Sequence, residues 1–342
     1  MRKSHAIALI VFLVVTIWAH AQGKAPLRLM RTIPLPGFEG CDFDQFAADL
    51  EGNRLFLAAE DHKTVEVFNL QTGKHLHSIA MFGNPHSIVY LPDSNRFIVT
   101  VGGSGISMLK LVSGDTYKII DTLNLPPGAD NAVYDPTRKY CYVENRGTDP
   151  SGNSNLLSII DTKTFKHIGD ITLPGRNSQA MAIEHSGKRL FINLAATNEV
   201  GVVDLQTHQV IAKWSVPEAS AQDALALDEA NHRVFIACRK PPRFIALDTD
   251  TGKVLANLPC VGGLDDMSYD AAHKRIYVTG DGTTSVFQQR DADHYEHIAE
   301  IPTGFQGKTS LFVPELNRLY VELSGKAKPE AKLALMIFLA QP

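Results

Sequence analysis

The sequence predicts an all-β fold, a seven-bladed β-propeller built from four-stranded antiparallel blades. Short runs rich in Val, Ile and Phe, separated by turn residues, are typical of strands rather than helices. The clearest set of such runs lies in residues 179–217. A unit of four strands that repeats every 40–45 residues or so is typical of a propeller blade. One basic residue opens the second strand of each unit, and these residues follow one another at intervals of 42–50: Arg54, Arg96, Lys139, Arg189, Arg233, Arg275 and Arg318.

The clearest unit shows why four strands make one blade. Residues 179–186 form a weak first run, and three stronger runs follow at residues 189–195, 200–205 and 210–217. Short polar turns separate the stronger runs, as expected for antiparallel neighbours. A single sheet of this kind cannot bury both of its faces, so it needs copies of itself on either side.

The first 21 residues predict a secretory signal peptide. Arg2 and Lys3 precede a short apolar run, and Ala19, His20 and Ala21 form an A-x-A cleavage site. An uncleaved membrane anchor is the alternative, but the run is short for a membrane span. We therefore expect a periplasmic or secreted protein whose residues 22–342 form one propeller domain.

Charge and hydropathy exclude two classes of partner. The formal net charge of the chain is −4, and it becomes more negative when the signal peptide is removed. The chain has no basic tract, which argues against nucleic acid as a partner. No second apolar run is long enough to span a bilayer, so no membrane span is expected after signal cleavage.

The two ends of the domain predict how the ring closes. Residues 27–34 resemble the outermost strand of the other units, whereas the chain stops after residues 332–339, which match a third strand. The last blade therefore lacks an outer strand, and the N-terminal segment has one to spare. We expect the two segments to pair, because closure removes open sheet edges. A closed ring needs no partner to cover an edge, so we expect a monomer.

Turns and one insertion account for much of the remaining polar sequence. Asp161, Asp204 and Asp248 recur in the turn between the third and fourth strands, where a carboxylate can accept hydrogen bonds from the turn backbone. One carboxylate per isolated turn is too few ligands for a metal ion.

The longest interval between anchors contains Glu144–Asn155, rich in Gly, Asn and Ser, which we expect to be an exposed loop on the face that carries the channel rim described below.

The four cysteines match no zinc or haem-attachment spacing. An exported protein permits disulfides, but the four residues fall in strands that are not neighbours. Buried free thiols are therefore expected at Cys41, Cys141, Cys238 and Cys260.

The repeat resembles that of a known family. Residues 275–286 read RIYVTGDGTTSV, and the blade pattern R-[LI]-[FY]-[VI] followed by V-x-V-x-D-x-x-T-G-K is similar to that of the bacterial YncE-like, YVTN-repeat propellers. This resemblance covers residues 22–342 and implies a seven-bladed ring. Propellers of this architecture include lactonases, lyases, quinoprotein dehydrogenase subunits and interaction modules, so the fold alone selects no function.

A polar ring at one channel mouth is the candidate functional site. Counting back from the end of each first strand gives one polar residue per blade, all on the same rim: Asp44, His86, Asp130, Gln179, Asp223, Asp265 and Lys308. Asn131 follows Asp130, and the connections between second and third strands place further polar residues on this face: His62, Arg146 and Arg239. Because strand backbones fix the ring residues, their charges should converge at the mouth.

Two interpretations of the ring remain open. Polar residues at a channel mouth can simply bond backbone groups or hold ordered water. Several carboxylates in one concavity also attract a hard divalent cation such as calcium, and no other cofactor is expected. His86 beside Asp44 and Asp130 is a candidate general base, although the spacing alone does not establish one.

Three functions fit this ring. The first, which we favour, is a non-catalytic binding module for a protein, a glycan or a small polar ligand. The second is a metal-dependent hydrolase resembling the gluconolactonase group, whose Glu, Asn and Asp ligands have counterparts here in Asn131, Asp223 and Asp44, with no Glu in the ring. The third is a lyase resembling the streptogramin-inactivating type, for which residues 85–88 (PHSI) are the single match to its P-H-G-I-like contexts.

Overall fold

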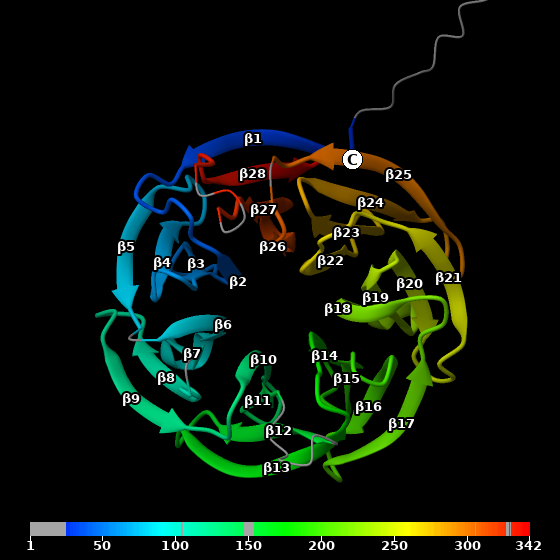
Figure 1. The fold of residues 1–342 in the computed structure, drawn as a ribbon, viewed down its shortest axis with the longest axis horizontal. Helices are drawn as coiled ribbons and strands as arrows, with labels where there is room; N and C mark the ends of the chain where they lie inside the picture. Colours follow the sequence, from blue (N-terminus) through cyan, green and yellow to red (C-terminus); the bar gives the residue numbers. More distant parts are fainter. Residues whose placement is uncertain are drawn as a thin grey trace, which may run out of the picture.

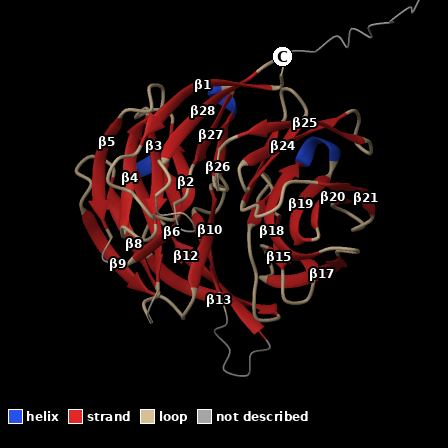
Figure 2. Cartoon of the chain, turned by 45° about the horizontal axis from the view of Figure 1, so that its top comes forward, coloured by secondary structure: helices blue, strands red, loops and turns tan. Residues whose placement is uncertain are grey.

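Seven four-stranded antiparallel sheets surround a central channel in the computed structural model, which describes residues 25–81, 83–103, 105–146, 154–304, 306–325, 328 and 330–342 (Figure 1). Strands make up nearly all of the regular structure, as the tilted view in Figure 2 shows. The predicted all-β, seven-bladed propeller is therefore confirmed.

Each blade runs from an inner strand at the channel to an outer strand at the wall of the disc. From the channel outward, the strands are β2 (Phe43–Asp49), β3 (Arg54–Ala59), β4 (Thr64–Asn69) and β5 (His75–Ala80) in blade 1; β6 (Asn84–Leu91), β7 (Arg96–Gly102), β8 (Met108–Ser113) and β9 (Ile119–Asn124) in blade 2; β10 (Ala129–Asp135), β11 (Tyr140–Asn145), β12 (Ser154–Asp161) and β13 (Lys166–Pro174) in blade 3; β14 (Met181–Ile183), β15 (Arg189–Leu194), β16 (Glu199–Asp204) and β17 (Gln209–Ser215) in blade 4; β18 (Ser220–Asp228), β19 (Arg233–Lys240), β20 (Pro242–Asp248) and β21 (Val254–Pro259) in blade 5; β22 (Asp266–Asp270), β23 (Arg275–Gly280), β24 (Thr283–Gln289) and β25 (Tyr295–Pro302) in blade 6; and β26 (Ser310–Val313), β27 (Arg318–Glu322), β28 (Ala334–Ala340) and β1 (Leu27–Pro34) in blade 7. Three short 3-10 turns also occur: η1 (Pro92–Ser94), η2 (Glu229–Asn231) and η3 (Pro314–Leu316).

The N-terminal strand closes the ring, as the sequence predicts. β1 pairs antiparallel with β28, from Leu27 opposite Ala340 to Pro34 opposite Ala334. Blade 7 therefore takes its three inner strands from the end of the chain and its outer strand from the beginning, and the two lie side by side in Figure 1.

The core lies between the blades. At each interface between adjacent sheets, apolar side chains from both sheets form one buried cluster. In one of these, Leu55 and Leu57 of β3 pack with Leu335 and Ile337 of β28. Burying one such side chain contributes about 1.5–3 kcal/mol. Because the middle strands are covered on both faces, their sequences are continuously apolar and do not alternate.

The anchor residue that defines the repeat in the sequence fastens one blade to the next. Arg54 of blade 1 pairs with Asp49 at 2.6 Å and donates to the Gly114 carbonyl of blade 2. Arg189 of blade 4 reaches the Thr249 carbonyl of blade 5, and Arg275 of blade 6 reaches the Gln341 carbonyl beside the closing strand. At these three positions the periodic basic residue thus has a structural role.

Replacing Arg54 should destabilise the protein strongly. Arg54→Met keeps the apolar stem but leaves the carboxylate of Asp49, which is 1% exposed, without its cation. Removing one partner of a buried ion pair costs about 3–5 kcal/mol. Arg96→Met is the matched control, because the equivalent Arg96 of blade 2 is exposed and makes no side-chain hydrogen bond with a described residue. Urea denaturation measures both free energies of unfolding, and equal losses would contradict this role for Arg54.

Several local predictions can also be compared with the structure. Asp161, Asp204 and Asp248 accept hydrogen bonds from the backbones of their turns, as predicted. Cys41, Cys141 and Cys238 are buried free thiols, but Cys260 is only half-buried. The signal peptide lies outside the described residues. No helix in the described part of the chain is long and apolar enough to cross a membrane.

The predicted exposed loop is too wide at both ends. Glu144 and Asn145 are the buried last residues of β11, and Asn155 is buried in β12. They are held in the sheet because β11 and β12 pair as far as Asn145 opposite Leu156. The remainder of that segment, residues 147–153, lies outside the described residues.

Candidate functional site

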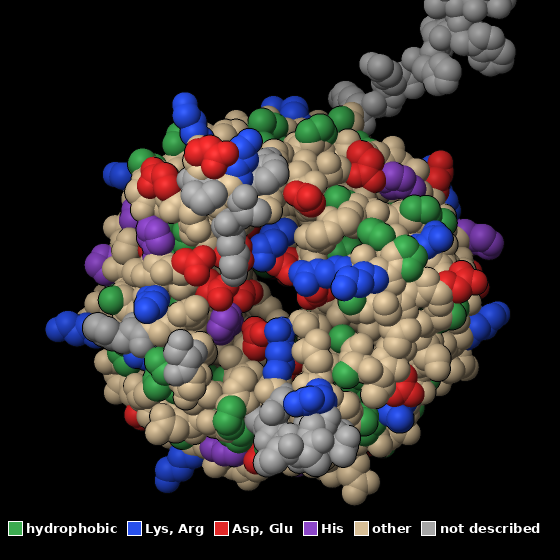
Figure 3. Space-filling view, in the orientation of Figure 1, with side chains coloured by type: hydrophobic (Ala, Val, Ile, Leu, Met, Phe, Trp, Pro, Cys, Tyr) green, Lys and Arg blue, Asp and Glu red, His purple; other side chains and the backbone are tan. Residues whose placement is uncertain are grey.

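The polar ring residues come together at one mouth of the channel. A cavity of about 200 Å³ opens there, and Figure 3 shows a hollow surrounded by acidic and basic side chains. Its lining includes six of the seven ring residues: Asp44, Asp130, Gln179, Asp223, Asp265 and Lys308. The seventh, His86, contacts Asp44, with Nδ1 2.9 Å from Asp44 Oδ2. Asn131, Arg146 and Arg239 also line the cavity.

Opposite charges alternate around this mouth. Each of the four ring carboxylates has a cation beside it, and three of these pairs are Asp44 with His86, Asp130 with Arg146 at 2.7 Å, and Asp223 with Arg239 at 2.6 Å. The fourth is Asp265, which lies 2.6 Å from the Lys308 ammonium and also contacts Arg239. The four carboxylates can therefore gather in one place because the protein supplies a cation for each.

Further acids lie behind the ring. Glu144 accepts hydrogen bonds from Asn131 at 3.0 Å and from Ser178 at 2.7 Å, and Asp266 accepts one from the Ser310 backbone amide at 2.8 Å. Glu144 is fully buried and Asp266 is half-buried, so both lie behind the charged side chains of the ring.

Burial raises the pKa values of several of these acids. It raises the pKa of Glu144 to about 7, and the neighbouring carboxylate of Asp130 adds to the effect. Burial and the charge of Asp265 raise the pKa of Asp266 to about 8. Burial, opposed by Arg239, raises the pKa of Asp223 to about 7. These carboxyl groups hold protons at neutral pH far more readily than a solvated carboxyl group does.

His86 is held as a cation. Burial lowers the pKa of His86, but the hydrogen bond to Asp44 and the carboxylate charges of Asp130 and Asp44 outweigh it and raise the pKa to about 9. The ring therefore carries four carboxylates and four cations when all are ionised.

A partly buried hydrogen-bond network ties the first strands of blades 1, 2 and 3 together. Three residues of this network directly follow a ring residue: Gln45, Ser87 and Asn131. Ser87 Oγ donates to Gln45 Oε1 at 2.6 Å, and Gln45 Nε2 donates to Asn131 Oδ1. Thr100, fully buried in β7, donates through Oγ1 to the Asp130 carbonyl at 2.7 Å and accepts from the Ser87 amide at 2.7 Å.

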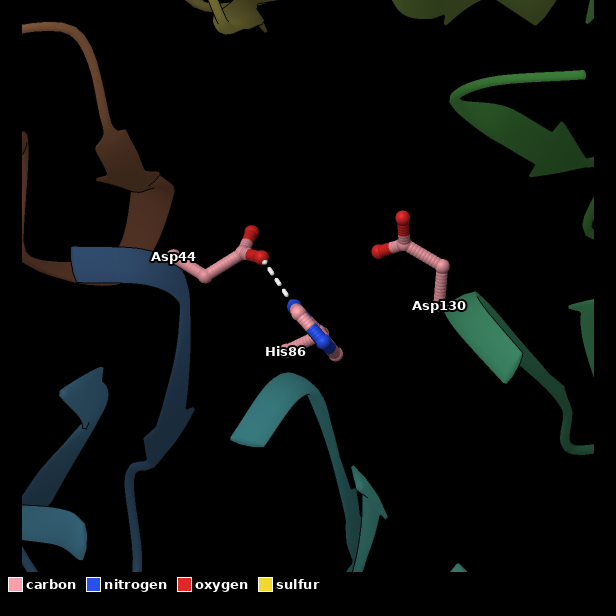
Figure 4. A group of neighbouring side chains, drawn as sticks. All are labelled: Asp44, His86 and Asp130. Atoms are coloured by element: carbon pink, nitrogen blue, oxygen red, sulfur yellow. Dashed lines mark hydrogen bonds and ion pairs between the residues drawn. The ribbon is translucent and has the colours of Figure 1, made fainter. Parts of the chain in front are cut away.

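Among the described residues, Asp44, His86 and Asp130 form a group that could hold a metal ion. One donor atom from each lies within 4.8 Å of the other two. The three side chains come from β2, β6 and β10 and point toward a common centre (Figure 4). The predicted alternative set of Asn131, Asp223 and Asp44 is less suitable, because Asn131 is bonded to Gln45 and Glu144, and Asp223 is paired with Arg239.

One predicted rim residue lies apart from the cavity. His62 is exposed in the turn between β3 and β4, and its ring stacks on Phe38 with centroids 4.7 Å apart. It does not line the cavity at the mouth, because Phe38, in the segment before β2, holds its ring. Sequence reasoning also missed Thr100, whose signal is a single polar residue inside the apolar run of β7.

The cavity continues into the channel. A second cavity of about 200 Å³ shares Gln45, Asn131, Ala180 and Asp266 with the first. Its remaining lining is mostly apolar and comes from the inner strands, for example Met181, Leu225 and Met267. The charged mouth thus leads to an interior with fewer charged residues.

The fold and this site define a seven-bladed propeller with a charged central mouth. No family model matches the chain. A curated relative, the uncharacterized protein YncE of Salmonella typhi, is 24% identical over 184 residues, which are 52% of this chain and 51% of that protein. YncE of Escherichia coli O157:H7 is 23% identical over 129 residues, 37% of this chain and 35% of that protein. These matches span about half or less of the relatives' length and, with the seven-bladed ring, confirm the resemblance to YncE-like propellers.

Solved structures agree on the fold. A chain in the crystal structure of a mitotic checkpoint complex superposes with a TM-score of 0.75 at 14% identity, covering 99% of both chains. A chain of Kuenenia stuttgartiensis hydrazine synthase gives a TM-score of 0.70 at 16% identity, covering 84% of this chain and 94% of that one. At these identities the similarity concerns the propeller fold alone.

Proposed function

We propose that the protein is an exported, non-catalytic binding module that takes a small polar ligand in its charged mouth. The observation that carries this proposal is the closed sequence of alternating charges around a cavity of about 200 Å³. Such a rigid set of paired charges is organised before the ligand arrives, so little conformational entropy is lost on binding.

The exposure of the charges favours a ligand that carries both signs. The Arg146 and Arg239 side chains are 34% and 37% exposed, whereas their partners Asp130 and Asp223 are 17% and 12% exposed. An anionic group of the ligand therefore meets the guanidinium groups first. The Asp44 carboxylate is 29% exposed on the other side of the mouth and suits a cationic group.

The proposed setting follows from the sequence and the closed ring. The signal peptide favours a periplasmic or secreted protein, and the pairing of β1 with β28 leaves no blade incomplete, which suits a monomer. A protein or glycan that offers a zwitterionic group to the mouth is an alternative ligand of the same chemistry.

Two enzymatic alternatives remain as competing hypotheses. A metal-dependent hydrolase would need an ion with an open position and a base beside it, and the group formed by Asp44, His86 and Asp130 is the observation in its favour. A lyase would rest on His86 alone, whose imidazole is engaged by Asp44. Both alternatives predict turnover, which the binding module does not.

Binding of small zwitterions tests the proposal. Purified protein is titrated calorimetrically with glycine betaine, lysine, arginine and glutamate. Replacing one charge that contacts the ligand, as in Arg239→Gln or Arg146→Gln, should weaken binding roughly 10- to 100-fold, because a charge-assisted hydrogen bond contributes about 1.5–3 kcal/mol.

The matched control for this test is Lys213→Gln on the outer strand β17, which should bind like the unchanged protein because Lys213 pairs with Glu199 outside the mouth. Absence of binding to every probe, or equal binding by the ring variants, would refute the zwitterion site.

A further inference from the structure

The mouth is not chemically uniform. On the side formed by blades 1, 2 and 3, one imidazole and two carboxylates converge beside Arg146, which pairs with Asp130 at 2.7 Å, whereas the side formed by blades 5, 6 and 7 carries carboxylates with Arg and Lys and no imidazole. Guanidinium and ammonium groups repel a metal ion. A deprotonated imidazole nitrogen can bind one, so a metal ion on this side has to displace the proton between His86 and Asp44, and the two sides differ in the ligands they can take.

The distances among the three donors suit a single ion. Ligand atoms that share one zinc ion at about 2.0–2.2 Å lie about 3.0–3.4 Å apart when the angle between them is near 90–109°. His86 Nδ1 and Asp44 Oδ2 are 2.9 Å apart, and the Asp130 donor lies within 4.8 Å of both. A small rotation of the Asp130 side chain, which breaks its ion pair with Arg146 at 2.7 Å, would complete the set.

A second observation indicates that this side is built as a unit. The network of Gln45, Ser87, Thr100 and Asn131 fixes the three strands that carry the donors, and it joins β2, β6 and β10 through partly buried hydrogen bonds. The residues that directly follow Gln179 and Asp223 are Ala180 and Ala224, so blades 4 and 5 cannot continue this side-chain network. Precise support of this kind is what a metal site requires of its surroundings.

We infer that Asp44, His86 and Asp130 form a binding site for a divalent transition metal of the zinc type. The nitrogen donor argues against calcium, which takes oxygen ligands in sets of six to eight. It favours zinc, or a similar ion such as cobalt, for which one imidazole and two carboxylates leave at least one position for water or a ligand. The inference goes beyond the proposed zwitterion binding and does not depend on it.

Zinc and cobalt titration of the full chain tests the site. After treatment with a chelator, the protein is dialysed against Zn²⁺, and bound metal is measured by elemental analysis. We expect one zinc ion per chain, and Co²⁺ in its place should show visible absorption of a nitrogen- and oxygen-bound ion. His86→Gln and Asp130→Asn should each weaken zinc binding at least tenfold, as the loss of one of three ligands implies.

The matched control is His185→Gln, because His185 also lies beside a carboxylate, Glu229, but is 96% exposed and outside the mouth. It should retain zinc binding. Circular dichroism of each variant establishes that the propeller is folded. Unchanged zinc binding in His86→Gln, calcium binding as tight as zinc binding, or no zinc bound at millimolar concentration would each overturn the inference.

Outcomes for the two proposals are separable. Loss of zinc binding in His86→Gln supports the metal site whatever the affinity of this variant for the zwitterion probes, because His86 also pairs with Asp44 of the proposed zwitterion site. Loss of zwitterion binding in Arg239→Gln with one zinc still bound supports the zwitterion site and leaves the metal site intact, because Arg239 contacts none of the three donors.

Discussion

The free energy of unfolding should fall as the pH rises from about 4 to about 8. Asp223, Glu144 and Asp266 are the cause, because burial raises their folded pKa values to about 7, 7 and 8. Between the unfolded and folded values, the folded state keeps the proton and the unfolded state releases it. The folded state then binds more protons, so stability decreases as pH increases.

The effect should be large, because three groups act in the same direction. Each contributes up to about 1.4 kcal/mol per pH unit while it is protonated in the folded state and ionised in the unfolded one. Below pH 4 the free energy of unfolding should fall as the pH decreases. Asp204, Asp248 and Asp291 have lowered pKa values, and their stabilising contributions are lost on protonation. Maximum stability is therefore expected near pH 4.

Urea denaturation at pH 5, 6, 7 and 8 measures this dependence. Asp266→Asn is the informative variant, because the amide can still accept the hydrogen bond from the Ser310 amide but cannot ionise. It should be as stable as the unchanged protein at pH 5 and more stable at pH 8. A flat or rising profile for the unchanged protein would contradict the raised pKa values.

The sequence predicts which residues lie on the ring better than it predicts which ion pairs they form. Register places Asp44, Asp130, Asp223 and Asp265 on one rim, because a slip of one residue would turn the inner strand over. The partners of these residues depend on how blades are set against each other. Arg239 belongs to β19 of blade 5 yet reaches Asp265 of blade 6. The sequence pattern of neither strand indicates such a contact between two sheets.

Some local errors have the same origin. His62 has the right place in the repeat, but Phe38, which comes before the first complete blade and has no counterpart in the repeat, binds its ring. Thr100 interrupts an apolar strand, and its role becomes apparent only when β6 and β10 are brought to either side of it. Arg54 joins blade 1 to blade 2 by donating to the carbonyl of Gly114, which is 60 residues away in the sequence.

Removing the closing strand should cost more stability than any single substitution considered above. A chain that begins after Gly37 loses β1 and its whole ladder with β28. It also loses Leu27, which is 3% exposed and packs with Phe338 between blades 6 and 7. Each lost hydrogen bond costs about 0.5–1.5 kcal/mol, and the apolar strand β28 becomes an open edge that promotes aggregation.

A matched pair of truncations tests the contribution of this strand. A chain beginning at Pro26 retains β1 and should melt like the unchanged protein, whereas one beginning at Phe38 should melt at a much lower temperature and aggregate. A synthetic peptide of residues 26–37 should restore part of the loss, because Pro26 and Leu35 also bond the last segment of the chain, at Gln341 and Leu333. Equal melting temperatures for the two truncations would mean that the ring is held closed by the six complete blades and the three inner strands of blade 7 without β1.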